Sequence, residues 1–168
     1  MYYGNAEDFK TYLTERGRDV SQTWTDEKIE AALLVASEWL DSQFEDLWIG
    51  YKLDYKQERS WPRQMAMVVT YPYYTFDTDE LPEQVVQATY EAAQRHLTNP
   101  GCLQVDYQPS PYSSVSIYNA VTVEYSTTVA SGGDTQLQIP VIQNLMSSLI
   151  DPDKNGDGNS LYGRAVRG

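Results

Sequence analysis

Four oxygen-bearing side chains alternate near the end of the chain, in the spacing that opens a calcium-binding loop. They are Asp151, Asp153, Asn155 and Asp157, and a glycine follows Asn155 where such loops turn sharply. The second half of the loop fails, because its twelfth position holds Tyr162 where a bidentate glutamate is needed. We therefore interpret the segment as a polar linker, with a calcium-dependent interaction module as an alternative, and expect no resident metal.

Nucleophilic and acid–base chemistry has few residues to use in this sequence. His96 is the only histidine and Cys102 the only cysteine, so neither a zinc ligand set nor a paired nucleophile and base can be assembled. Carboxylates cluster at Asp41, Glu45, Asp46 and Asp54. Paired acids serve catalysis when they are buried in a cleft, whereas these follow the polar end of a predicted helix. We expect no enzyme activity and no cofactor, since a glycine-rich phosphate loop is also missing.

One aromatic residue lies close to two arginines. Trp61 follows Arg59 and precedes Arg63, a grouping that suggests a platform on which a nucleic-acid base stacks. The simpler interpretation is that the Trp61 ring covers one end of a helical bundle. Both interpretations remain open at the level of the sequence.

The charge balance argues against nucleic-acid binding. The chain carries 24 acidic and 12 basic side chains, a net charge of −12, with no run of lysine or arginine. A nucleic-acid binder gains much of its affinity by neutralising phosphates with a basic face. The acidic balance is compatible with the inner wall of a ring through which DNA slides, or simply with solubility.

Tyrosine is unusually frequent in this chain, with fourteen tyrosines against three phenylalanines. Either the tyrosines contribute to an interface with another molecule, or tyrosine simply takes the place of phenylalanine.

The expected compartment is reducing. A single cysteine excludes a disulfide framework within the chain. The first residues lack the pattern of a signal peptide, and no stretch reaches the roughly 18 apolar residues of a membrane span. We expect a protein that is made and folded in a cytoplasm without membrane association.

Helical periodicity predicts a mainly α fold. The periodic segments are residues 6–16, 26–44, 82–98 and 140–150. Asn5 and Thr25 are suited to cap the first two, while Pro82 and Pro140 are suited to the first position of the last two. We expect a small bundle of about four helices that forms one domain over residues 1–150.

The segments between the helices follow other patterns. Residues 46–80 look irregular, with aromatic side chains expected to point inward and a short strand over Met65–Tyr74. Residues from about 114 to 130 alternate in the manner of a β-hairpin. A two-stranded hairpin is only marginally stable in water, so it should pack on the helices or pair with a neighbouring copy. Residues 151–168 are polar and glycine-rich, which predicts an extended, flexible C-terminal tail.

Taken in order, these elements resemble one protein family. The segments that carry the resemblance are Ala31–Ala36, Trp39-Leu40-Asp41, Gly50, Ser60-Trp61-Pro62-Arg63, Leu81-Pro82-Glu83, Val121–Tyr125 and Ile139-Pro140. They are similar to the small adaptor, or head-completion, proteins that connect head to tail in tailed bacteriophages. That family is also described as DnaT-like and single-stranded DNA-binding. No single motif is specific, but their order is.

The resemblance implies a structural adaptor of the phage neck, located in the virion at the head–tail junction. It would form a homo-oligomeric ring of about twelve copies that binds the portal protein and a stopper or tail protein, and DNA would pass through without specific binding. The tail residues expected to contact a partner are Leu161, Tyr162, Arg164 and Arg167. The alternative is a single-stranded DNA-binding replication accessory protein.

Overall fold

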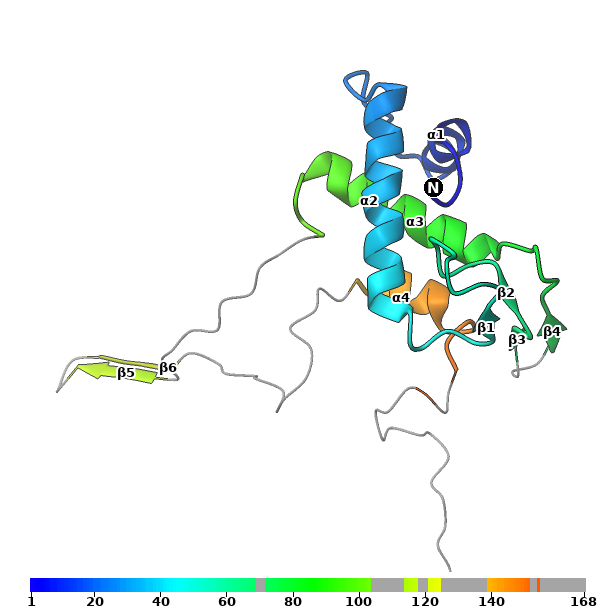
Figure 1. The fold of residues 1–168 in the computed structure, drawn as a ribbon. Coiled ribbons are helices and arrows are strands. Elements are labelled where there is room, and N and C mark those ends of the chain that lie inside the picture. The colour runs from blue at the N-terminus through cyan, green and yellow to red at the C-terminus, as the bar shows by residue number, and fades with distance from the viewer. Residues whose placement is uncertain (69–71, 104–113, 118–120, 125–138, 152–153, 155–168) are drawn as a thin grey trace, which may run out of the picture.

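The computed structural model describes residues 1–68, 72–103, 114–117, 121–124, 139–151 and 154. Its described part is mainly α-helical, as predicted, with four helices and three two-stranded antiparallel ribbons (Figure 1). In chain order the elements are α1 (Ala6–Glu15), α2 (Asp26–Phe44), β1 (Tyr51–Lys52), β2 (Arg63–Gln64), β3 (Met67–Val68), β4 (Tyr74–Thr75), α3 (Glu83–Thr98), β5 (Ser114–Ile117), β6 (Val121–Glu124) and α4 (Pro140–Met146). None of the described helices is long and apolar enough to cross a membrane.

The first two helices begin where the sequence predicts. The side-chain oxygen of Asn5 accepts a hydrogen bond from the backbone N–H of Asp8 at 2.8 Å. Thr25 does the same for Lys28 at 3.4 Å. Each cap satisfies one of the backbone donors that the first turn of a helix leaves unpaired.

Helix α3 is the centre of the bundle, because it contacts α1, α2 and α4. Its largest interface is with α2, and α1 contacts both of them (Figure 1). The contact face of α2 includes Ile29, Leu33 and Leu40, none of which is exposed to solvent, and Trp39 is buried as well. Burial of this apolar stripe supplies the main driving force for the bundle.

Helix α3 begins one residue later than predicted. Pro82 precedes the helix in an extended conformation, and Glu83 is the first helical residue. The buried face includes Val85 and Thr89, as expected, but also Glu91. A buried carboxylate inside an apolar stripe requires partners, and these are described with the site below.

Helix α4 is shorter than predicted, so the expectation of a helix up to Ile150 was wrong. It ends at Met146, and the following residues run beside the segment after α2. The backbone N–H of Ile49 donates to Leu149 O at 3.0 Å, and that of Asp151 donates to Leu47 O at 2.8 Å. The apolar residues beyond Met146 are therefore buried by a distant segment of the chain instead of by helical packing.

Residues 46–80 are largely irregular, as predicted, but only some of their aromatic rings point inward. Trp48, Trp61 and Phe76 are buried and meet edge to face, with ring centroids 5.8 and 5.6 Å apart. Tyr51 and Tyr55 instead face solvent. This inward and outward division follows no periodicity that the sequence shows.

The short strand expected over Met65–Tyr74 is instead two strands of two residues each, β3 and β4, because the chain reverses direction between them and they pair antiparallel. Each of the two N-terminal ribbons is antiparallel, with Tyr51 opposite Gln64 and Val68 opposite Tyr74. A hydrogen bond from Phe76 N to Ala66 O at 2.9 Å extends the β3–β4 pairing by one residue on each strand.

Gly50 allows the backbone before β1 to lie close to the backbone at the end of β2. Its φ of +67° suits glycine, and a Cβ at this position would lie 2.5 Å from Gln64 O and 2.8 Å from Ala66 N. Both of these are backbone atoms that cannot rotate away.

The predicted hairpin is present as β5 and β6, with Val115 opposite Val123. It contacts no other described helix or strand. We expected the hairpin either to pack on the helices of the same chain or to pair with a neighbouring copy. The first arrangement is not seen among the described elements. Pairing with a neighbouring copy stays a prediction.

Candidate functional site

The four carboxylates that are clustered in the sequence do not lie together in a cleft of the folded protein. Asp41 is buried, Glu45 pairs with Lys52 on the surface, and Asp54 accepts a hydrogen bond from Lys56 N at 2.8 Å. Asp46 is exposed. Within the described residues, no three histidine, cysteine, aspartate or glutamate side chains gather closely enough to hold a metal ion.

Asp41 instead ties the N-terminus to the bundle. The Tyr3 hydroxyl donates to its Oδ1 at 2.7 Å, and the backbone N–H of Ser60 donates to its Oδ2 at 3.3 Å. The guanidinium of Arg59 lies 3.5 Å away. Burial raises the pKa of Asp41, and burial together with the adjacent Asp41 charge raises the pKa of Tyr3. Every polar atom of Asp41 is engaged internally, which indicates a structural role.

Of the two interpretations of Trp61 that the sequence left open, the structure favours the buried ring over the base-stacking platform. The Trp61 ring is 2% exposed and Arg63 is 5% exposed. The Arg63 guanidinium donates to the carbonyl oxygens of Ile49 and Gly50, both at 2.9 Å, and burial lowers its pKa. Trp61 therefore covers one end of the bundle, and Arg63 connects the backbone segments around it.

A second buried network surrounds Glu91, a residue that was not among those predicted from the sequence. Its carboxylate accepts hydrogen bonds from Arg95 at 2.8 Å, Arg18 at 2.9 Å and the Tyr12 hydroxyl at 3.0 Å. Burial acts to raise the pKa of Glu91, but the hydrogen bonds from Arg95 and Arg18 outweigh it and hold the pKa below its ordinary value. The available signal was a charged residue inside the alanine-rich stripe of α3.

Cys102 and His96, each the only residue of its type in the sequence, have no activating partner among the described residues. Burial raises the pKa of the Cys102 thiol, which disfavours the thiolate. The Nδ1 atom of His96 is buried and has no hydrogen-bond partner among the described residues.

Most of the predicted binding residues lie outside the described part of the chain. Of the four candidate calcium ligands only Asp151 is described, and its carboxylate is 3.8 Å from the ammonium of Lys154. The other candidate ligands, Asp153, Asn155 and Asp157, lie outside it. So do the predicted partner-binding residues Leu161, Tyr162, Arg164 and Arg167.

What the structure does present is an exposed apolar surface on the two ribbons, which we call the ribbon surface. Its members are large apolar or aromatic residues that face solvent, namely Tyr51, Leu53, Tyr55, Met65, Met67, Tyr73 and Tyr74. Tyr55 is fully exposed at 101%, and Met65 and Tyr73 are exposed at 76% and 73%. The ribbons gather at one end of the molecule, beyond the start of α3 (Figure 1). The sequence signal for this surface was the abundance of tyrosine.

Lysines lie along the β1 side of the ribbon surface. Lys154 Nζ is 5.9 Å from the centre of the Tyr51 ring, and Lys52 pairs with Glu45. Lys56 has no ion pair with any described residue. Exposed aromatic rings beside lysines are a feature of surfaces that bind single-stranded nucleic acid.

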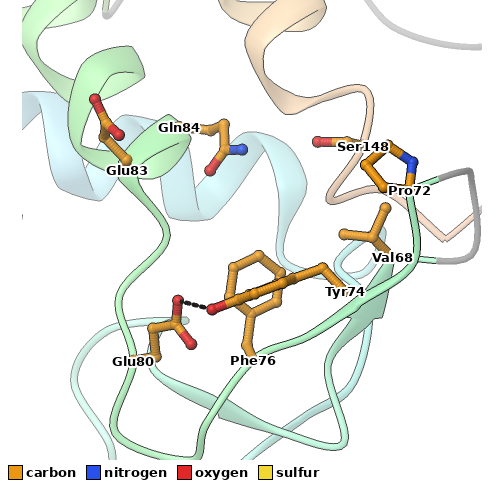
Figure 2. A pocket seen from close by; sticks show the side chains of 8 residues that line it. All are labelled: Val68, Pro72, Tyr74, Phe76, Glu80, Glu83, Gln84 and Ser148. Atoms are coloured by element: carbon orange, nitrogen blue, oxygen red, sulfur yellow. Dashed lines mark hydrogen bonds between the residues drawn. The ribbon is translucent and has the colours of Figure 1, made fainter.

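On the β3–β4 side, a groove of about 560 Å³ opens between the ribbon and the start of α3 (Figure 2). Its lining residues are Val68, Pro72, Tyr74, Phe76, Glu80, Glu83, Gln84 and Ser148. The Tyr74 hydroxyl donates to Glu80 Oε1 at 2.8 Å, as Figure 2 shows. The groove thus combines aromatic and aliphatic side chains with two carboxylates, a lining suited to a peptide segment with apolar and basic side chains.

Comparison with known protein families gives a match over nearly the whole chain. A family model described as "Putative DnaT-like ssDNA binding protein" matches residues 2–168. No curated protein and no solved structure matches the chain. The match confirms the DnaT-like part of the resemblance, and it lends no support to the phage-connector part.

Proposed function

The chain belongs to this DnaT-like family, and we propose that it acts as a structural adaptor of a phage neck, binding other proteins through its ribbon surface. In this role it forms a ring between the portal vertex and the tail. The observation that carries the proposal is the ribbon surface itself. The family description points to a different role, which is treated below as the second candidate.

The composition of the ribbon surface favours a protein partner. Tyrosine and methionine are enriched in protein interfaces, because they offer large contact areas at a small entropic cost. Large apolar side chains that are exposed on a small protein also cost free energy in water unless a partner covers them. Tyr51, Met65 and Tyr73 are all more than half exposed in the single chain.

The positions of the cations also favour a protein partner. Arg18 and Arg95 are committed to Glu91, Arg59 to Asp41, and Arg63 to backbone carbonyls. These arginines are thus engaged within the fold, and the chain has a net charge of −12. Neutralisation of phosphates dominates nucleic-acid affinity, and these arginines leave little free positive charge for it.

A ring requires head-to-tail contacts, in which one patch of a subunit meets a different patch of the next. The β5–β6 hairpin is suited to such a contact, since its strand edges can add to another sheet. Under this proposal the remaining partners are the portal protein and a stopper or tail protein. The subunit is made in the host cytoplasm and ends in the virion, where DNA passes through the ring.

Quantitative mass spectrometry of purified particles tests the adaptor proposal. We expect about twelve copies per particle, present together with the portal protein. A double variant, Tyr51→Ala with Tyr55→Ala, should assemble poorly, whereas the control Val141→Ala alters an apolar residue that is 46% exposed outside the ribbon surface. Absence of the wild-type protein from particles would refute the proposal.

The second candidate is single-stranded DNA binding, and the family match supports it better than it supports the adaptor. The structural observation in its favour is the β1 side of the ribbon surface. There Tyr51 and Tyr55 are exposed near Lys52, Lys56 and Lys154. Bases stack on such rings, and lysines contact the backbone phosphates.

Titration of a fluorescent oligothymidine tests this candidate directly. Binding should weaken as salt rises, with a slope of about −0.7 for each phosphate contact. The Tyr51→Ala and Tyr55→Ala pair should weaken it by about 1–3 kcal/mol for each stacked base, while Val141→Ala should leave it unchanged. Absence of binding at low salt would exclude the candidate.

A further inference from the structure

We propose that the C-terminal segment Leu161–Arg167 docks in the groove between the β3–β4 ribbon and the start of α3 of the same chain. The inference concerns the free protein and holds whether the chain is an adaptor or a DNA-binding protein. It rests on the lining of the groove, on the charges of groove and segment, and on the distance between them.

The groove offers both apolar and hydrogen-bonding contacts. Tyr74 and Phe76 meet edge to face with centroids 4.9 Å apart, and Tyr74 remains half exposed. Across from them, Gln84 and Ser148 have no side-chain hydrogen bond with any described residue (Figure 2). An extended peptide presents apolar side chains and backbone amides, and both would find partners here.

The charges of the groove favour a cationic occupant. Glu80 accepts hydrogen bonds from the Tyr74 hydroxyl and the Asp77 backbone, and Glu83 accepts one from Gln87. All three donors are neutral, and neither carboxylate pairs with a cation among the described residues. The two negative charges are thus available to a guanidinium, and they oppose a phosphate.

The C-terminal segment has the complementary chemistry. It contains Leu161, Tyr162 and Val166, together with Arg164 and Arg167, and no acidic residue. In a chain with twice as many acids as bases, two arginines without a neighbouring acid are unusual. Leucine, tyrosine and valine match the apolar lining, and arginines match its carboxylates.

The segment is also within reach. Lys154 donates to the backbone carbonyl of Trp48 at 3.0 Å. The Trp48 ring contacts Trp61, which contacts Phe76 in the groove. Six residues separate Lys154 from Leu161, and seven Cα steps of extended chain span up to about 24 Å. A tether of this length gives an effective concentration of about millimolar, which favours a chain's own segment over a second copy.

Disulfide trapping in the full-length chain tests the inference. In a Cys102→Ser background, Tyr162→Cys is combined with Gln84→Cys in the groove. The matched control combines Tyr162→Cys with Thr98→Cys, an exposed position at the other end of the same helix, about 21 Å away. A third pair with Ser148→Cys probes the groove from another element, in case the Gln84 variant folds poorly. Mild oxidation and intact-mass analysis give the rate of the intrachain bond.

We expect the groove pairs to form the intrachain bond about tenfold faster than the control, as a docked segment requires. Adding Glu80→Gln and Glu83→Gln should slow them about three- to fivefold, the effect of removing exposed ion pairs. Equal rates for groove and control pairs would overturn the inference, as would insensitivity to the glutamate substitutions. Bonds formed mainly between chains would assign the groove to a neighbouring copy and overturn it as well.

Discussion

Buried charges define this fold at the scale of single residues. Glu91 is only 2% exposed, yet it holds two arginines and a tyrosine hydroxyl from three segments of the chain. Arg18 comes from the loop after α1, Tyr12 from α1 itself, and Arg95 from the next turn of α3. The carboxylate therefore fixes how α1 sits on α3.

Replacing Glu91 with glutamine should destabilise the protein by about 2 kcal/mol. A fully buried pair loses more, but the two arginines keep some contact with water. Urea denaturation measures the change. The control Glu83→Gln removes a charge from the same helix where it is exposed and should cost less than about 1 kcal/mol. Equal losses for both variants would contradict a special role for Glu91.

The same carboxylate predicts a pH dependence. The pKa of Glu91 is lowered in the folded state from its ordinary 4.5. Between the two pKa values the unfolded chain binds a proton that the folded chain does not, so the folded state gains stability as pH rises. The difference in unfolding free energy between wild type and Glu91→Gln should be largest near neutral pH and shrink below pH 4.5. A difference that stays constant down to low pH would show that the lost interaction is not ionic.

At the scale of elements, the ends of helices that depend on neighbouring residues were predicted correctly, whereas an end that depends on distant contacts was not. The starts of α1 and α2 depend on a capping residue within three positions, so Asn5 and Thr25 could be identified from the sequence. The end of α4 depends on hydrogen bonds between residues 47–49 and 149–151. No local pattern shows that competition, which is why the helix was predicted too long.

The exposed ribbon surface was only partly predictable for the same reason. Tyrosine abundance was compatible with an interface, but it did not show which tyrosines are exposed. Arg59 and Arg63 looked like surface cations beside Trp61, whereas their partners include the carbonyls of Met1 and Ile49. Those partners are adjacent only after folding, so spacing along the chain could not identify them.

Gly50 offers a test of how the ribbons are held. Gly50→Ala should destabilise by about 3 kcal/mol, because a positive φ and a backbone clash act together. Gly17→Ala is the control, since Gly17 has a φ of +65° but no atom within 4 Å of the added Cβ. It should lose only the conformational part, about 1 kcal/mol. Thermal denaturation of both variants separates the two terms, and equal losses would mean that the ribbons shift without cost.

At the scale of the whole molecule, the net charge of −12 opposes the compact state through self-repulsion. Added salt should therefore stabilise the fold. The Debye length falls from about 30 Å at about 0.01 M salt to about 8 Å at 0.15 M. We expect the melting temperature to rise by about 2–4 °C over that range. The gain should disappear as the pH approaches the isoelectric point near 4.3, and a fall in melting temperature at neutral pH would contradict the argument.

The anchoring of the chain on both sides of the hairpin has a consequence for variation in length. Leu103 and Ile139 are both buried in the body, and the hairpin lies between them in the sequence. For a flexible chain between two fixed ends, the entropic cost of closure grows only with the logarithm of its length, so doubling the length costs about 0.6 kcal/mol. The body therefore places almost no constraint on the number of residues inserted or deleted there. The length of the chain between Leu103 and Ile139 is therefore set by the partner surface that the hairpin contacts.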